Sequence, residues 1–132
     1  MKKQKIHIEK VLNCRSANII WPLMSTAAGL EKWIADTVEE EGDELKFTWG
    51  DVWKHHEIRM ARIVEQERFD HIRFAGDDDP DASEYWELKI ERSDLTGDYI
   101  LIITDFALEE DVDSIHDVWE ANLEQLHHNT GL

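Results

Sequence analysis

Apolar and polar residues alternate in several short segments of the chain, a pattern typical of strands that bury one face. In the first segment, residues 3–12, Ile6 and Ile8 alternate with His7 and Glu9. Further segments of this kind lie at residues 44–49, 52–64, 71–75, 85–91 and 99–106. Turn-forming residues, mostly glycine followed by aspartate, separate them. Strands joined by short turns pair as hairpins, so the sequence predicts an antiparallel sheet.

The alternation also assigns the two faces of this sheet. One face is predicted to carry large apolar side chains, with one threonine among them: Leu45, Phe47, Trp49, Ile72, Phe74, Trp86, Leu88, Ile90, Ile100, Ile102, Thr104 and Phe106. On the last strand this assignment places Leu101 and Ile103 on the opposite face, beside Tyr99. The apolar face then needs another element to cover it.

The cover is predicted to be a long amphipathic helix at residues 111–126. Apolar residues recur there at spacings of three and four, namely Val112, Ile115, Val118, Trp119, Leu123 and Leu126. Two shorter helices are predicted at residues 16–24 and 25–36. Pro22 lies in the first of them, which must therefore place the proline in its first turn or bend. We expect these short helices to close one end of the space between sheet and long helix, with Trp33 at its mouth.

Composition narrows the possible functions. The chain has 132 residues, so a single domain over residues 1–132 is expected. Its formal net charge of −16 disfavours nucleic acid and acidic membrane surfaces as partners. Cys14 is the only cysteine, and no segment is apolar enough for a signal peptide or a membrane span. We therefore expect a cytoplasmic protein without integral membrane association.

Several local motifs, together with the order of elements, resemble a known family. These motifs are WPLMSTAAGLEKWIAD at residues 21–36, FTWGD at 47–51, YWELKIE at 85–91, LTGDYILIITDFA at 95–107 and VWEANLEQL at 118–126. They resemble the START-like or SRPBCC superfamily, and within it the small bacterial proteins related to the activator of the ninety-kilodalton heat-shock protein ATPase. The resemblance implies an α+β helix-grip fold, in which a curved antiparallel sheet wraps around a long C-terminal helix. It also implies an apolar ligand between the two, or a chaperone-type protein partner.

Aromatic and polar residues of the predicted interior are the candidate ligand-binding residues. The aromatic candidates are Trp33, Trp49, Phe74, Trp86 and Trp119, which either line a pocket or fill the core. Asn122 lies within the apolar stripe of the long helix, where a buried amide needs a hydrogen-bond partner in the protein or in a ligand. Thr104, predicted to lie on the inner side of its strand, likewise needs a hydrogen-bond partner in the protein or in a ligand.

Metal binding and catalysis have little support in the sequence. His55 and His56 are adjacent on a strand and point to opposite faces, and the other histidines lack ligand spacing. The acidic segment at residues 75–84 resembles a calcium loop but lacks its glycine and its final glutamate. Catalytic motifs are absent as well. We expect neither a metal nor a cofactor, and no catalytic residue is assigned.

Three hypotheses for function follow from these patterns. The first is a non-catalytic intracellular module that binds an apolar, aromatic or lipid-like small molecule between sheet and long helix. The second is a protein-interaction module with a filled core, whose partner is a chaperone-type protein or a second copy of the chain. The surface of Tyr99, Leu101 and Ile103 is its predicted contact. The third is an enzyme that acts on a hydrophobic substrate.

Overall fold

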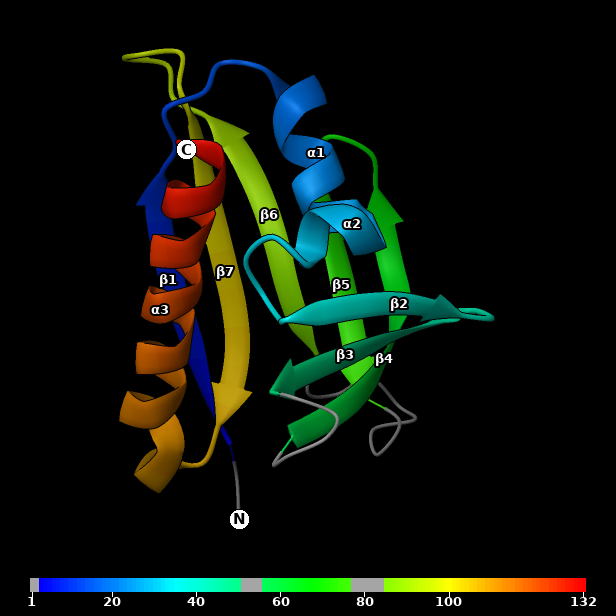
Figure 1. Cartoon of the computed structure of the whole chain (residues 1–132). Helices are drawn as coiled ribbons and strands as arrows, with labels where there is room; N and C mark the ends of the chain where they lie inside the picture. The colour runs from blue at the N-terminus through cyan, green and yellow to red at the C-terminus, as the bar shows by residue number, and fades with distance from the viewer. Residues whose placement is uncertain (1–2, 51–55, 77–84) are drawn as a thin grey trace.

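The computed structural model describes residues 3–50, 56–76 and 85–132 and shows one antiparallel sheet (Figure 1). Its strands are β1 (Gln4–Val11), β2 (Thr37–Glu41), β3 (Glu44–Gly50), β4 (His56–Glu67), β5 (His71–Gly76), β6 (Trp86–Arg92) and β7 (Tyr99–Ala107). They pair in the order β1-β7-β6-β5-β4-β3-β2. The first strand therefore lies beside the last, while the others follow one another as hairpins.

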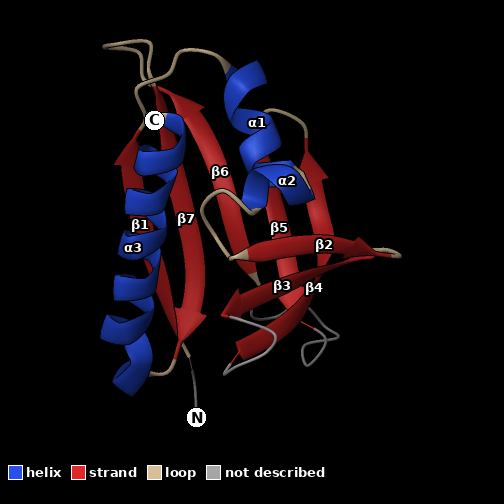
Figure 2. Cartoon of the chain, viewed as in Figure 1, coloured by secondary structure: helices blue, strands red, loops and turns tan. Residues whose placement is uncertain are grey.

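The helices all lie on one face of this sheet (Figure 2). They are α1 (Ala17–Ser25), α2 (Ala27–Leu30) and the C-terminal α3 (Val112–Thr130), which a short 3-10 turn, η1 (Glu109–Asp111), precedes. Helix α3 runs along β1 and β7 and contacts both. The helix-grip architecture predicted from the sequence is thus confirmed. We call the face that carries the helices the inner face. None of the helices in the described ranges combines the length and hydrophobicity needed to cross a membrane.

Helices α1 and α2 meet at a tight corner. Helix α1 begins at Ala17, so Pro22 lies in its interior rather than in its first turn. The backbone N–H and the hydroxyl of Thr26 both donate to the carbonyl of Pro22, at 3.2 and 2.7 Å. A Cβ added to Gly29 would lie 1.9 Å from the same carbonyl oxygen. Only glycine allows α2 to approach α1 this closely.

Strand β2 was not predicted from the sequence. It reads TVEEE, and Val38 is its only large apolar residue. Val38 is buried and pairs with Phe47 of β3. Because a single apolar residue does not make an alternating pattern, the sequence does not predict this strand or its pairing with β3.

The predicted faces are correct for β3, β5 and β6 but wrong for β7. Leu101 and Ile103, predicted to lie outside, are 1% and 0% exposed. Ile103 pairs directly with Leu88, a fully buried residue of the inner face. Directly paired residues share a face, so Thr104, which pairs with Glu87, lies on the outer face instead. Leu101 and Ile103 therefore cannot form an exposed contact surface.

The core lies between α3, the short helices and the inner face. Helix α3 contributes Trp119, Leu123 and Leu126, which are all buried. Val118, predicted to belong to the same stripe, is 51% exposed. The buried stripe of α3 is therefore narrower than the sequence suggests. Helix α3 lies over β1 and β7 rather than over the whole inner face of the sheet.

Candidate functional site

A continuous aromatic cluster lies between α3 and the inner face. The rings of Phe74 and Trp86 stack with centroids 4.1 Å apart, and Trp86 contacts Trp119 of α3 at 5.9 Å. Trp119 in turn meets Trp33 at 6.2 Å. On the other side, Phe47 lies 5.8 Å from Trp86. The aromatic residues predicted to line a pocket or to fill the core thus pack against one another.

Two tryptophans at the edge of this cluster remain partly accessible. Trp49 and Trp86 are half-buried, whereas Trp33 and Trp119 are 2% and 5% exposed. Trp49 stacks on Phe47 with ring centroids 6.1 Å apart. The exposed aromatic surface is therefore held rigidly by the packed rings beneath it.

A groove with a volume of about 430 Å³ opens beside Trp49. Its walls are the segment after α2, the end of β3 and one side of α3. The lining residues are Glu31, Lys32, Trp33, Ile34, Ala35, Asp36, Trp49, Ala121, Asn122, Gln125 and Asn129. The groove is the mouth of the space between sheet and C-terminal helix, where Trp33 was expected.

Indole N–H groups fix the wall formed by residues 31–36. Trp49 Nε1 donates to the carbonyl oxygen of Ile34 at 2.8 Å. Trp33 Nε1 donates to the carbonyl oxygen of Leu23 at 2.9 Å, which satisfies an acceptor at the C-terminal end of α1. Both rings are thereby held in one orientation.

Carboxylates and an amide tie the same segment to β2, β3 and α3. The Glu31 carboxylate accepts from the backbone N–H of Val38 at 3.0 Å, and the Asp36 carboxylate accepts from that of Gly50 at 2.6 Å. Asn129 Nδ2 of α3 donates to the carbonyl oxygen of Lys32 at 2.6 Å. The groove is therefore preorganised, which lowers the entropic cost of binding.

The opposite wall carries amide side chains of α3. Asn122, Gln125 and Asn129 follow one another at spacings of three and four, so they lie on one side of the helix. Asn122 is half-buried, and its side chain has no hydrogen bond within the described part of the chain. It can offer both a donor and an acceptor to a molecule in the groove.

One half-buried carboxyl group adjoins the aromatic cluster. Trp119 Nε1 donates to Oδ2 of Asp105 at 2.9 Å, and the backbone N–H of Phe106 donates to Oδ1 at 2.8 Å. Burial raises the pKa of Asp105, while these two hydrogen bonds and the charges of Lys3 and Arg59 oppose the rise. Asp105 lies on the inner face because it shares the parity of Ile103.

The structure separates the candidate residues into three groups. Trp33, Trp49 and Asn122 line the groove, while Phe74, Trp86 and Trp119 form the cluster beneath it. Thr104 lies on the outer face and does not reach either place. The neighbours of Trp33 in the segment 31–36, together with Gln125 and Asn129, were not foreseen, although the helical spacing of Asn122, Gln125 and Asn129 could have pointed to the two amides. The rejected calcium loop falls mostly in residues 77–84, outside the described residues, as does His55.

Comparison with known families gives a match over the whole chain. The START-like superfamily domain matches residues 1–132. None of the curated proteins is similar in sequence to this chain.

Solved structures include one with substantial sequence similarity. The solution structure of BfR322 from Bacteroides fragilis is 40% identical, with a TM-score of 0.64, over 97% of this chain and 91% of that one. The Aha1 dimer from Colwellia psychrerythraea is 14% identical, with a TM-score of 0.72, over 97% and 98%. CalU16 from Micromonospora echinospora is 14% identical, with a TM-score of 0.68, over 96% and 75%. The two more distant likenesses concern the fold alone.

Proposed function

Because the chain belongs to the START-like superfamily, we propose that it is a non-catalytic binding module for a small apolar or aromatic molecule. The molecule binds in the groove between residues 31–36, Trp49 and α3. The sequence left open whether these aromatic residues line a pocket or fill the core, and in this proposal the packed rings form the floor of the groove. The ligand lies over the aromatic cluster rather than inside it.

The half-buried indole of Trp49 is the observation that carries this proposal. Its Nε1 is bonded to Ile34 and its ring is stacked on Phe47, so the ring face is fixed without a ligand. A rigid aromatic face offers a large contact area at little entropic cost. Asn122 and Gln125 face the same groove from α3 and provide hydrogen bonds that select orientation.

Charge restricts the ligand further. The chain carries a formal net charge of −16, and Glu31 and Asp36 line the groove. A negative field of this kind disfavours anionic ligands. A neutral, flat molecule with one hydrogen-bonding edge fits the aromatic wall on one side and the amides on the other.

The test uses neutral bicyclic aromatics such as indole and quinoline as probes. Titration of ¹⁵N-labelled protein should shift the indole N–H signal of Trp49 and the side-chain amide signals of Asn122 and Gln125. Asn122→Ala should weaken binding, whereas Glu124→Ala, an exposed residue of the same helix outside the groove, should not. Shifts confined to other parts of the protein would contradict the proposal.

Native mass spectrometry of the protein from its own host complements this titration. A bound small molecule that Asn122→Ala releases would support the groove as its site. A protein that arrives without ligand and also leaves the probes unbound would reject the binding function.

A second candidate function is self-association through the outer face. Val11 is 57% exposed on β1 and pairs with the half-buried Ile100 of β7, and no helix of the described chain lies on this face. A protein with this fold, the Aha1 of Colwellia psychrerythraea, is described as a dimer. Sedimentation equilibrium should then show a dimer that Val11→Lys dissociates. Ile19→Lys, at an equally exposed position of α1, should leave it intact.

A further inference from the structure

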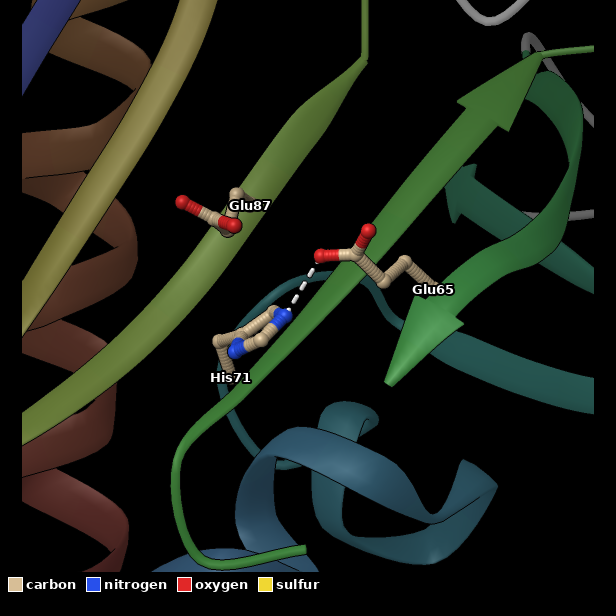
Figure 3. Close-up of side chains that lie close together, drawn as sticks. All are labelled: Glu65, His71 and Glu87. Atoms are coloured by element: carbon tan, nitrogen blue, oxygen red, sulfur yellow. Dashed lines mark hydrogen bonds and ion pairs between the residues drawn. The ribbon is translucent and has the colours of Figure 1, made fainter. Parts of the chain in front are cut away.

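The outer face carries a second polar site, remote from the groove in sequence and on the other side of the sheet. Glu65 of β4, His71 of β5 and Glu87 of β6 bring their ligand atoms within 4.8 Å of one another. Figure 3 shows Glu65 and His71 pointing toward each other from neighbouring strands, with Glu87 on the next strand. Three strands therefore supply one nitrogen and two carboxylate groups to the same point.

A β-bulge creates this arrangement. Ile63 pairs with Phe74, but Glu65 pairs with Arg73, so Val64 is an extra residue in β4. If Val64 instead paired with Arg73 in regular alternation, Glu65 would lie opposite Ile72 on the inner face. The bulge moves the Glu65 carboxylate to the outer face, beside His71. Bulges that redirect a side chain in this way are frequent next to functional sites.

Hydrogen bonding leaves the two nitrogens of His71 in different roles. Nδ1 lies 2.6 Å from Asp70 Oδ2, and Nε2 lies 2.6 Å from Glu65 Oε2. A neutral imidazole has one N–H, and donation to Asp70 uses it. The contact between Nε2 and the Glu65 carboxylate is then made either through a second N–H, in the imidazolium form, or through a bound cation. A carboxylate behind a histidine is also the usual support of a metal-ligating imidazole.

Neighbouring side chains fit a cation at this point. Arg73 Nε donates to one oxygen of Glu87 at 2.7 Å, which fixes that carboxylate and leaves its second oxygen available. The His71 and Glu87 side chains are only 15% and 12% exposed, while the Glu65 side chain is 52% exposed and can adjust. Lys89 Nζ lies 3.8 Å from Oδ2 of Asp70. The carboxylates of Glu65, Glu87 and Asp70 together balance the charge of a divalent ion and that of Arg73, whose Nε lies 2.7 Å from Glu87 and 3.7 Å from Glu65.

We propose that Glu65, His71 and Glu87 form a binding site for a divalent transition-metal ion such as Zn²⁺. Nitrogen and carboxylate ligands suit this class of ion, whereas calcium prefers sites made of oxygen alone. In tetrahedral coordination with bonds of about 2.0–2.2 Å, ligand atoms lie about 3.4 Å apart. A small rotation of the exposed Glu65 side chain opens its contact with His71 to that spacing. Three protein ligands leave the fourth position of the ion open.

Calorimetric titration of the tag-free protein with ZnCl₂ tests this site. At about pH 7.5, where metal binding does not have to displace many protons, one Zn²⁺ should bind per chain. His71→Ala or Glu87→Gln should weaken binding by at least about tenfold. His116→Ala, an exposed histidine of α3 beside Glu120, is the matched control and should bind like the parent protein.

Nuclear magnetic resonance of the imidazole nitrogens identifies the ligand atom. Zn²⁺ should shift Nε2 of His71 and leave Nδ1 protonated. Glu87→Gln preserves an acceptor for Arg73, so it keeps the test valid if His71→Ala does not fold. Absence of zinc binding, equal binding by Glu87→Gln, or a doubly protonated His71 that zinc does not change would each overturn the proposal.

Discussion

Trp119 of α3 and Asp105 of β7 are joined by a hydrogen bond of 2.9 Å across the interface between helix and sheet. Trp119 is also in contact with Trp33 and Trp86. The Asp105 carboxyl group therefore helps to orient the ring that connects the groove wall to the cluster beneath it. Because partial burial raises the pKa of this carboxyl group, its ionisation affects folding.

The first prediction concerns pH. Burial raises the pKa of Asp105 above that of the unfolded chain, so the folded state binds the proton more tightly. At pH values below its pKa in the unfolded chain, protonated Asp105 contributes to the free energy of unfolding. This contribution is lost as the pH rises through its pKa in the folded protein. Relative to the parent protein, Asp105→Asn should be more stable at about pH 7 than at about pH 4. Urea unfolding of both proteins at the two pH values measures this difference. A variant that is more stable relative to the parent protein at about pH 4 than at about pH 7 would contradict the prediction.

The corner between α1 and α2 gives the second prediction. Gly29→Ala should destabilise the fold by about 1–3 kcal/mol or more, because its Cβ would collide with the Pro22 carbonyl and α2 would have to move. Helix propensity alone would have favoured alanine by about 1 kcal/mol, so the sign of the change is diagnostic. Ala28→Gly, at an exposed position of α2, is the control and should cost no more than about 1 kcal/mol. Thermal and urea unfolding provide the measurement.

The third prediction tests the faces of β7. Leu101→Ala should cost about 2–5 kcal/mol of unfolding free energy, because Leu101 is 1% exposed. Ile100→Ala should cost clearly less, since Ile100 is half-buried on the outer face. Equal or reversed losses in urea titrations would support the opposite assignment of the strand.

The fourth prediction compares two indole hydrogen bonds. Trp33→Phe leaves the Leu23 carbonyl without its indole donor in a buried position and should cost about 1–3 kcal/mol beyond the loss of ring area. Trp49→Phe removes the bond to Ile34, but at a half-buried position where water can replace it, so the loss should be smaller. Urea unfolding of the two variants should show a larger loss of unfolding free energy for Trp33→Phe than for Trp49→Phe, and the opposite order would contradict the prediction.

Sequence patterns were sufficient for most of the architecture. Strands β3, β5 and β6 alternate between apolar and charged residues, and α3 repeats apolar residues at helical spacing, so both kinds of element and their inner faces could be predicted. In β7, however, Leu101 and Ile103 are as apolar as their neighbours Ile100 and Ile102. Because residues 100–103 are all apolar, the pattern does not show which alternate residues face the core, and the two faces of β7 were assigned the wrong way round.

The candidate sites were less accessible to prediction. Trp33, Trp49 and Asn122 were chosen as interior residues, and the structure places them along the groove. Whether the interior was open or filled depends on how side chains from separate strands pack, which a periodic pattern does not contain. The cluster around His71 depends on the bulge at Val64, and no residue pattern around this position predicts that β4 contains an extra residue.

Val64 also changes how β4 responds to evolution. The two ends of this strand follow opposite parity rules, so a residue number alone does not tell which side of the sheet a substitution will reach. Deletion of Val64 would restore regular alternation and leave Glu65, Gln66 and Glu67 opposite Arg73, Ile72 and His71, as they are now. Strand β4 can therefore shorten by this one residue without exchanging its faces, although the bulge would be lost.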